Sequence, residues 1–238
     1  ETDLACSLLV HGEFCGGWIW REVADALSLE GHEVHTPSLT GLGDRSHLLT
    51  AETGLSIHVA DIANYISSYD LRNVILVAHG YGGLAACGAA EHRARRIARM
   101  VFLDGIPGAD GRSWMDLADE GAREDLRTLS ASTPEGWKVP PLTPSALGVM
   151  CASDIERTVP RLGPMPMKAF AEPLSIPKAE YLRLPCSYAL CINPVHSAMV
   201  SAAAAEAKRR NWQYHELVTS HMAMVNTPEE VVRILLYS

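Results

Sequence analysis

The segment that most constrains the fold of this chain is residues 73–90, NVILVAHGYGGLAACGAA. The run Asn73–Ala78 is continuous and rich in β-branched residues, which is typical of a strand buried on both faces. The small residues after it predict a sharp turn, and the alanine-rich stretch beyond predicts a helix. A buried strand, a tight turn and a helix are together the context of a nucleophile elbow, whose motif is G-x-S-x-G.

The nucleophile position of this elbow is occupied by glycine. The five residues of the motif are AHGYG, and the apolar strand before them and Gly82-Gly83 after them set the register. Gly80 therefore stands where serine would stand. Glycine has no side chain and cannot form an acyl-enzyme, but it tolerates the strained dihedral angles of such a turn. A turn kept only for its structure is the alternative interpretation.

The flanking sequence predicts an α/β fold. Apolar runs at 4–10, 99–104, 187–191 and 212–218 predict further strands, and segments with helical spacing lie between them. Thr227-Pro228-Glu229-Glu230 forms a capping box with proline at the first helical position, which predicts that the last helix begins there. Strands that alternate with helices indicate a mostly parallel sheet flanked by helices.

The middle of the chain differs in composition. Eleven of the fourteen prolines fall between residues 107 and 185, so this stretch cannot be sheet interior. We expect a core domain formed by residues 1–106 and 186–238, with residues 107–185 inserted as a lid over the ligand-binding crevice. Its apolar residues either line that crevice or pack the lid onto the body. The candidates are Trp114, Met115, Met165, Met167 and Phe170.

Composition and charge exclude several functional classes. The formal charge is -8, with 20 basic and 28 acidic residues, which disfavours a nucleic-acid partner. No apolar run approaches the ~18 residues that span a membrane. The six cysteines lie mostly in apolar stretches and are expected to be free thiols, so we expect a cytoplasmic protein. No zinc-ligand spacing, phosphate loop or G-x-G-x-x-G is present, and we expect no metal and no cofactor.

Several ordered motifs carry a resemblance to a known family. LLVHGEFCGGWIW, TPSLTGLGDRSHLL, LVAHGYGG, MVFLDG and SHMAMVNTPEEV are similar to small proteins of the α/β-hydrolase fold. Bacterial esterases and the plant methyl esterases and hydroxynitrile lyases belong to this group. The resemblance covers the sheet core from end to end and is weak in the lid. It implies an α/β-hydrolase fold with an inserted helical lid.

The resemblance also assigns positions in the catalytic site. The family's histidine matches His221, its serine matches Gly80, and its acid matches Asn193 in CINPV. The oxyanion-hole amides match Glu13 and Tyr81. Only the histidine of the triad is retained, because glycine cannot act as the nucleophile and asparagine cannot stabilise an imidazolium by charge.

Two acidic residues could compensate for these losses. Asp104 ends the predicted strand RMVFLD on the crevice side, where it either supports His221 or caps the next turn. Glu13 either turns inward, beside the empty nucleophile space, where it could serve as a general base, or is a surface charge.

Three functions are compatible with this pattern. The first is a non-hydrolytic enzyme that binds a small carbonyl compound and catalyses cyclisation, elimination, rearrangement or aldol-type lyase chemistry, with His221 as acid/base and the amides of Glu13 and Tyr81 as the oxyanion hole. By family analogy, bacterial secondary metabolism of the polyketide or antibiotic type recruits such altered hydrolases. The second is a serine-free esterase, or one inactivated by engineering. The third is a non-catalytic protein that binds a small molecule. A homodimer is compatible with the sequence, which does not decide the oligomeric state.

Overall fold

A computed structural model describes residues 4–193 and 197–237 and contains one six-stranded, entirely parallel sheet. Its spatial order is β2-β1-β3-β4-β7-β8. The strands are β1 Cys6–Val10, β2 Glu33–His35, β3 Val74–His79, β4 Ile97–Leu103, β7 Cys186–Cys191 and β8 Gln213–Leu217. This arrangement confirms the parallel α/β sheet that the alternating pattern predicts.

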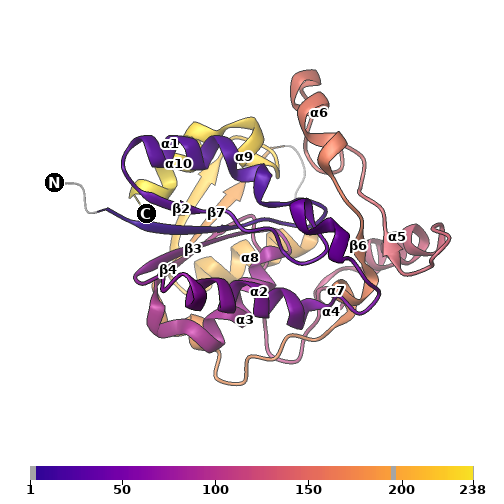
Figure 1. The fold of residues 1–238 in the computed structure, drawn as a ribbon, viewed down its shortest axis with the longest axis horizontal. Coiled ribbons are helices and arrows are strands. Elements are labelled where there is room, and N and C mark those ends of the chain that lie inside the picture. Colours follow the sequence, from indigo (N-terminus) through magenta and orange to yellow (C-terminus); the bar gives the residue numbers. More distant parts are fainter. Residues whose placement is uncertain (1–3, 194–196, 238) are drawn as a thin grey trace.

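Helices cover both faces of the sheet. Figure 1 shows α1, α9 and α10 together on one face and α2 and α3 on the other. The helices outside the insertion are α1 Arg21–Leu29, α2 Leu55–Ser68, α3 Gly82–Arg93, α8 Ala198–Arg209, α9 Ala223–Asn226 and α10 Pro228–Tyr237. The last of these begins at Pro228, as the capping box predicts. No helix in the described ranges is long and apolar enough to cross a membrane.

Residues 107–185 lie in the chain between β4 and β7, and this segment is called the insertion below. Its helices α5 and α6 extend away from one end of the sheet (Figure 1). Its elements are α4 Trp114–Leu117, α5 Glu120–Ala131, β5 Lys138–Val139, α6 Ala152–Thr158, β6 Met165–Pro166 and α7 Met167–Ala171. The two short strands pair antiparallel with each other and apart from the main sheet. Its role as a lid stays a prediction.

The central strand and its helix form the densest part of the core. Every residue of β3 is buried, and so are the first nine residues of α3. Two glycines let this helix approach its neighbours: an added Cβ would lie 2.5 Å from the carbonyl oxygen of His11 at Gly82, and 2.5 Å from that of Ile106 at Gly83. The helix is therefore fixed against the loops that follow β1 and β4. All six cysteines are free thiols, as expected.

Strand register brings three loops together at the carboxyl ends of the strands. Ala78 is paired with Val10 on one side, and His79 with Leu103 on the other. The residues just beyond these pairs are His11 after β1, Gly80 after β3 and Asp104 after β4. Parallel sheets place ligand-binding crevices at this edge, so the register alone gathers the candidate residues.

Burial of His11 predicts a loss of stability in acid. Its Nε2 accepts a hydrogen bond from the Leu39 backbone N–H (3.0 Å), so the ring is neutral, and Nδ1–H donates to the Gly12 carbonyl (2.8 Å). Burial lowers the pKa of His11 from 6.5 to about 4. The neutral ring therefore favours the folded state above the unfolded pKa, and this contribution is lost as the pH falls toward the folded pKa. Between about pH 7.5 and pH 5 the loss from this residue should be about 2 kcal/mol.

Urea unfolding at the two pH values checks this contribution. His11→Gln should be less stable than the parent at about pH 7.5 and should lose about 2 kcal/mol less on acidification. His47→Gln is the control, because His47 is exposed and lies in the short 3₁₀ helix Gly43–Leu48. A pH dependence that is the same in His11→Gln and in the parent would contradict the assignment.

Candidate active site

Gly80 forms the turn between β3 and α3 in a left-handed backbone conformation. Its φ is +50°, and its carbonyl oxygen accepts hydrogen bonds from the backbone N–H groups of Gly83 (3.1 Å) and Ile106 (3.0 Å). Side chains at such φ values are strained, which is the conformation expected of a nucleophile elbow. The elbow geometry is therefore present, with hydrogen in place of a side chain.

His221 and Asp104 form a hydrogen-bonded pair beside this turn. His221 lies in the loop after β8, and its Nδ1 is 3.1 Å from Oδ2 of Asp104. Asp104 is buried, with φ +45°, and its other oxygen, Oδ1, accepts from the Cys191 backbone N–H at 2.7 Å. Since Oδ2 faces Nδ1, the imidazole directs Nε2 toward Gly80. An ideal Cβ on Gly80 would lie 3.4 Å from that Nε2.

The charges around His221 favour its protonated form. Burial lowers the pKa of His221, but the hydrogen bond to Asp104 and the charges of Asp104 and Glu13 outweigh burial, so the pKa is raised above 6.5. His79 packs against this ring with 4.2 Å between centroids, and its Nε2–H donates to the His221 carbonyl oxygen (2.9 Å). Burial, followed by the charge on His221, keeps the pKa of His79 well below 6.5. His79 is therefore a neutral donor that holds the His221 loop.

The side chain of Glu13 turns inward and occupies the place of an oxyanion. Its Oε2 accepts a hydrogen bond from the Tyr81 backbone N–H (3.0 Å), which is the amide that the family resemblance assigns to the oxyanion hole. The same oxygen would lie 2.6 Å from an ideal Cβ on Gly80. The Tyr81 amide is thus already paired with a carboxylate, so the structure differs from the expected free oxyanion hole. The Tyr81 phenol points away and bonds His58 Nδ1 (2.8 Å).

These groups open into a cavity of about 200 Å³. Its polar lining consists of Glu13, Asp104, Asp119, Ser197 and His221, so three acidic residues and one histidine border it. The rest of the lining is glycine and apolar side chains: Gly80, Ile106, Trp114, Ala118, Ala122, Leu142, Ala146, Met199 and Val200. A neighbouring hollow of about 240 Å³ shares Ile106 and Met199 with it. The lining favours a small, uncharged and largely apolar ligand.

The structure separates the five apolar residues expected to line the crevice. Trp114 lines the cavity. Met115, Met165, Met167 and Phe170 are not among its lining residues. The last of these packs against other rings: Phe170 contacts Phe14, Tyr81 and Trp114 with centroids 5.2–6.1 Å apart. Phe170 is therefore one of the side chains that pack the insertion onto the body of the protein.

Asn193 does not contact His221. It follows β7, its side chain is exposed, and its backbone N–H donates to the Thr219 carbonyl oxygen (2.9 Å). Asp104, after β4, is the acid that faces the imidazole instead. The position matched to the family acid is thus replaced by one from a neighbouring strand. The RMVFLD segment already indicated Asp104 as a candidate acid, since this aspartate ends a buried strand at the crevice edge.

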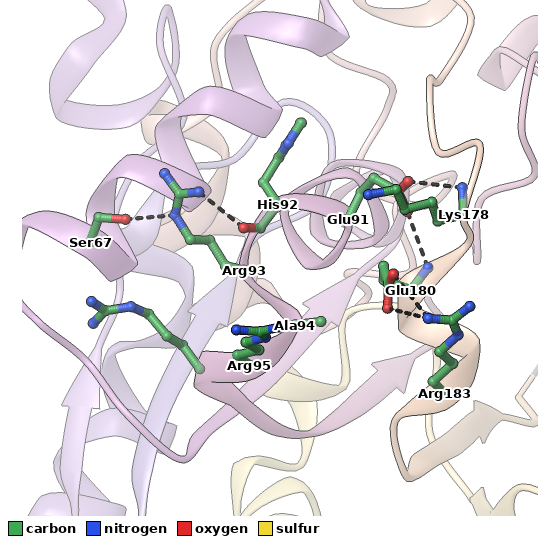
Figure 2. Close-up of a pocket in the computed structure, with 10 residues that line it drawn as sticks. Ser67, Glu91, His92, Arg93, Ala94, Arg95, Lys178, Glu180 and Arg183 are labelled. Carbon is green, nitrogen blue, oxygen red and sulfur yellow. Dashed lines mark hydrogen bonds and ion pairs between the residues drawn. The ribbon is translucent and has the colours of Figure 1, made fainter.

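Another hollow, larger than this cavity, is a different kind of feature. It holds about 630 Å³ and lies where α3 ends and β4 begins, at the opposite edge of the sheet from Gly80. Figure 2 shows that several of its charged side chains already have partners: Arg183 contacts Glu180, and Arg93 donates to Ser67. Glu91 accepts from two backbone N–H groups. The acid–base groups lie instead in the smaller cavity.

Comparisons with known proteins agree with the observed fold. A carbendazim-hydrolyzing esterase from Nocardioides sp. (strain SG-4G) is 41% identical over 114 residues, which span 48% of this chain and 47% of that protein. The putative chloroplastic methylesterase 13 of Arabidopsis thaliana is 32% identical over 114 residues, which span 48% of this chain and 26% of its own length. The matched segments thus cover about half or less of these relatives.

Solved structures match over almost the whole chain, and at their level of identity they show the fold alone. An extracellular alpha/beta-hydrolase from a Paenibacillus species superposes with a TM-score of 0.85 at 20% identity, covering 98% of each chain. Tomato methylketone synthase I, in complex with 2-tridecanone, gives 0.78 at 17% identity, over 98% of this chain and 96% of its own. The sequence model described as "Alpha/beta hydrolase family" matches residues 8–234. This chain therefore belongs to the alpha/beta hydrolase family.

Proposed function

We propose that this protein is an enzyme that moves protons on a small carbonyl compound without forming a covalent intermediate. One observation carries the proposal: the Glu13 carboxylate and the His221 imidazole converge on the volume that a serine side chain would fill, 2.6 and 3.4 Å from an ideal Cβ on Gly80. A base and an acid on two sides of one small space suit proton abstraction next to a carbonyl group.

The roles follow from charge. The Glu13 carboxylate removes a proton from the carbon next to the carbonyl, and His221, whose pKa is raised, donates its Nε2 proton to the carbonyl oxygen. The product of this step is an enol, and each group recovers its original protonation state when the enol reacts onward. Asp104 holds the imidazole through Nδ1. Ring closure, elimination, rearrangement and aldol-type cleavage can all proceed from an enol.

The lining of the cavity supports an uncharged substrate. Glu13, Asp104 and Asp119 would repel an anionic group, and the remaining surface is mostly apolar. The 200 Å³ cavity is smaller than the roughly 300–1,000 Å³ of typical ligand sites, and the adjoining hollow past Ile106 and Met199 offers room for an apolar extension of the substrate. We infer that the substrate is a neutral ketone or aldehyde with an apolar body.

Hydrogen–deuterium exchange tests this proposal directly. The protein in D₂O should exchange the α-protons of neutral aryl ketones such as acetophenone, followed by NMR. Glu13→Gln and His221→Ala should each slow the exchange by about 10²–10⁴-fold. Glu30→Gln and His47→Ala are matched controls, because both residues are exposed and outside the cavity. Exchange that is unchanged in Glu13→Gln and His221→Ala would overturn the proposal.

Hydrolysis by an activated water molecule is the second candidate, favoured by the similarity to the carbendazim-hydrolyzing esterase. The same two groups could deprotonate a water molecule placed at Gly80. Turnover of p-nitrophenyl acetate that disappears in His221→Ala, with no acyl-enzyme in the mass spectrum, would favour this route over enolisation. Ligand binding that survives in His221→Ala without either reaction would instead identify a binding protein. A role in bacterial secondary metabolism, a cytoplasmic location and a homodimer stay predictions.

A further inference from the structure

We propose that Cys6, Glu33 and His35 form a zinc-binding site at the amino-terminal ends of β1 and β2. Parallel pairing places Cys6 opposite Glu33, and side-chain alternation puts Glu33 and His35 on one face of β2. Their ligand atoms, one sulfur, one carboxylate oxygen and one imidazole nitrogen, all lie within 4.8 Å of one another. The site is independent of the proposed function, because β1 separates it from the catalytic cavity by about 13 Å of strand.

The donor set indicates which metal would bind. Thiolate, imidazole and carboxylate are the three side-chain ligands that Zn²⁺ uses in proteins. Mg²⁺ and Ca²⁺ prefer oxygen ligands alone, so the sulfur and the nitrogen select against them. Three protein ligands leave the fourth tetrahedral position to water.

The histidine is already oriented for this purpose. Its Nδ1 is hydrogen-bonded to the hydroxyl of Tyr65 on α2 (3.1 Å), and the two rings pack edge to face. Its Nε2 therefore faces Glu33 Oε1 at 2.9 Å. Metal-binding histidines characteristically have a hydrogen-bond partner on the second ring nitrogen, which fixes the tautomer and the direction of the ligating nitrogen. Tyr65 supplies that partner from a different element of the fold.

Zinc binding at this site should release a measurable proton from the Cys6 thiol. Burial, followed by the charge and hydrogen bond of Glu33, raises the pKa of Cys6 to about 11. Cys6 is therefore protonated at neutral pH before metal binds. Zinc takes the thiolate as its ligand, so binding releases the Cys6 proton to the buffer.

A zinc ion here would join an exposed edge of the sheet to its interior. β2 is the edge strand and has only three residues, Glu33–His35. A metal bound between β1 and β2 stabilises the folded state by mass action and holds that edge in register. Cys6 lies on β1 and the other two ligands on β2, and 27 residues separate Cys6 from Glu33. No short spacing motif in the sequence therefore predicts this ligand set.

Metal titration of the untagged, chelator-treated protein tests the site. Calorimetry with Zn²⁺ should show one site per chain and an enthalpy that varies with the buffer's ionisation enthalpy, as proton release requires. Co²⁺ should give a near-ultraviolet sulfur-to-cobalt charge-transfer band. Cys6→Ser should abolish that band, and Tyr65→Phe should weaken zinc binding about 10–100-fold. Melting temperatures measured in EDTA show that each variant is folded.

The matched control is Cys151→Ser, which removes the exposed free thiol before α6. It should bind Zn²⁺ with unchanged affinity and keep the cobalt band. The proposal is overturned by absence of zinc binding in the parent protein, by full affinity in both Cys6→Ser and His35→Gln, or by loss of the cobalt band in Cys151→Ser.

Discussion

Replacing Asp104 by asparagine should lower the rate of α-proton exchange about 10⁴-fold and leave the fold intact. Asp104 Oδ1 accepts from the Cys191 backbone N–H, and Oδ2 accepts from His221 Nδ1–H. An asparagine must keep its oxygen toward Cys191, so its NH₂ group would face Nδ1. Without the carboxylate the imidazole would be neutral, with its one proton on Nε2, and a neutral imidazole is a far weaker proton donor to the carbonyl oxygen than the imidazolium that Asp104 favours. The equivalent change in a serine protease has an effect of this size.

The effect of Asp104→Asn on the pKa of His221 can be measured without any substrate. Asp104 supplies both the hydrogen bond and the largest favourable charge that raise the pKa of His221, so Asp104→Asn should lower that pKa. NMR titration of the histidine ring protons measures the change. For stability the sign is fixed: the raised pKa stabilises the folded protein below the unfolded value of 6.5, and this contribution is lost as the pH rises through the folded pKa. The variant should lack it.

Asp119→Asn is the matched control for this prediction. Asp119 lines the same cavity, but its side chain caps α5 by accepting from the Ala122 backbone N–H. Asparagine caps helices as well as aspartate does. Asp119→Asn should therefore retain most of the turnover and leave the His221 titration unchanged. Equal losses in the two variants would show that cavity charge, and not support of His221, is what matters.

Restoring the missing nucleophile should create an esterase only when Glu13 is removed as well. A serine at position 80 would have its Cβ 3.4 Å from His221 Nε2, so its hydroxyl falls within reach of the retained His221–Asp104 pair. Its Cβ would also lie 2.6 Å from Glu13 Oε2, and the Tyr81 amide would remain occupied by that carboxylate. A developing oxyanion would be repelled there. Gly80→Ser alone should therefore be nearly inactive.

The double variant Gly80→Ser/Glu13→Ala removes both obstacles. The Tyr81 N–H becomes free to stabilise an oxyanion, and the serine gains space. We expect p-nitrophenyl acetate turnover to rise on the order of 10⁴-fold over Glu13→Ala, short of the ~10⁶-fold that serine hydrolases lose without their nucleophile. The φ of +50° at Gly80 should cost about 1–2 kcal/mol of stability in either serine variant.

Fluorophosphonate labelling followed by mass spectrometry separates the possible outcomes. Such reagents react with an activated serine, so the double variant should be labelled rapidly and Glu13→Ala not at all. Equal labelling rates in Gly80→Ser and in the double variant would refute the view that the Glu13 carboxylate blocks this space. A double variant that is folded but unlabelled would show that the His221–Asp104 pair cannot activate a hydroxyl.

The sheet and the elbow were predictable because local patterns determine them. The buried run before Gly80 and the glycines after it leave few ways to build residues 73–90, and the structure confirms the parallel sheet. The pairing of His221 with Asp104 depends on strand order. Sequence similarity placed the acid after β7, at Asn193, whereas the structure has it after the adjacent strand β4. Both positions lie at the same edge of the sheet, and sequence alone does not choose between them.

The surroundings of Glu13 and Phe170 were beyond local patterns. The Glu13 side chain turns inward because the Tyr81 backbone N–H is available as a hydrogen-bond donor. That amide lies 68 residues further along the chain, so no local pattern around Glu13 predicts the contact. Phe170 and Trp114 have similar apolar character, yet Trp114 lines the cavity and Phe170 is buried among aromatic rings. Which of two such side chains faces the cavity is decided by packing between the insertion and the body.

The contact between Glu13 and the Cβ position of residue 80 also bears on how such a site evolves. A lineage that still has serine can lose it in one step, and the vacated space then admits a carboxylate from position 13. Once that carboxylate rests on the Tyr81 amide, regaining serine alone gives a crowded site without an oxyanion hole. Reversal requires glutamate to leave first, through an intermediate that has neither group. Glu13 therefore acts as an epistatic ratchet: loss of serine at position 80 takes one substitution, whereas regaining a working serine requires a change at position 13 first.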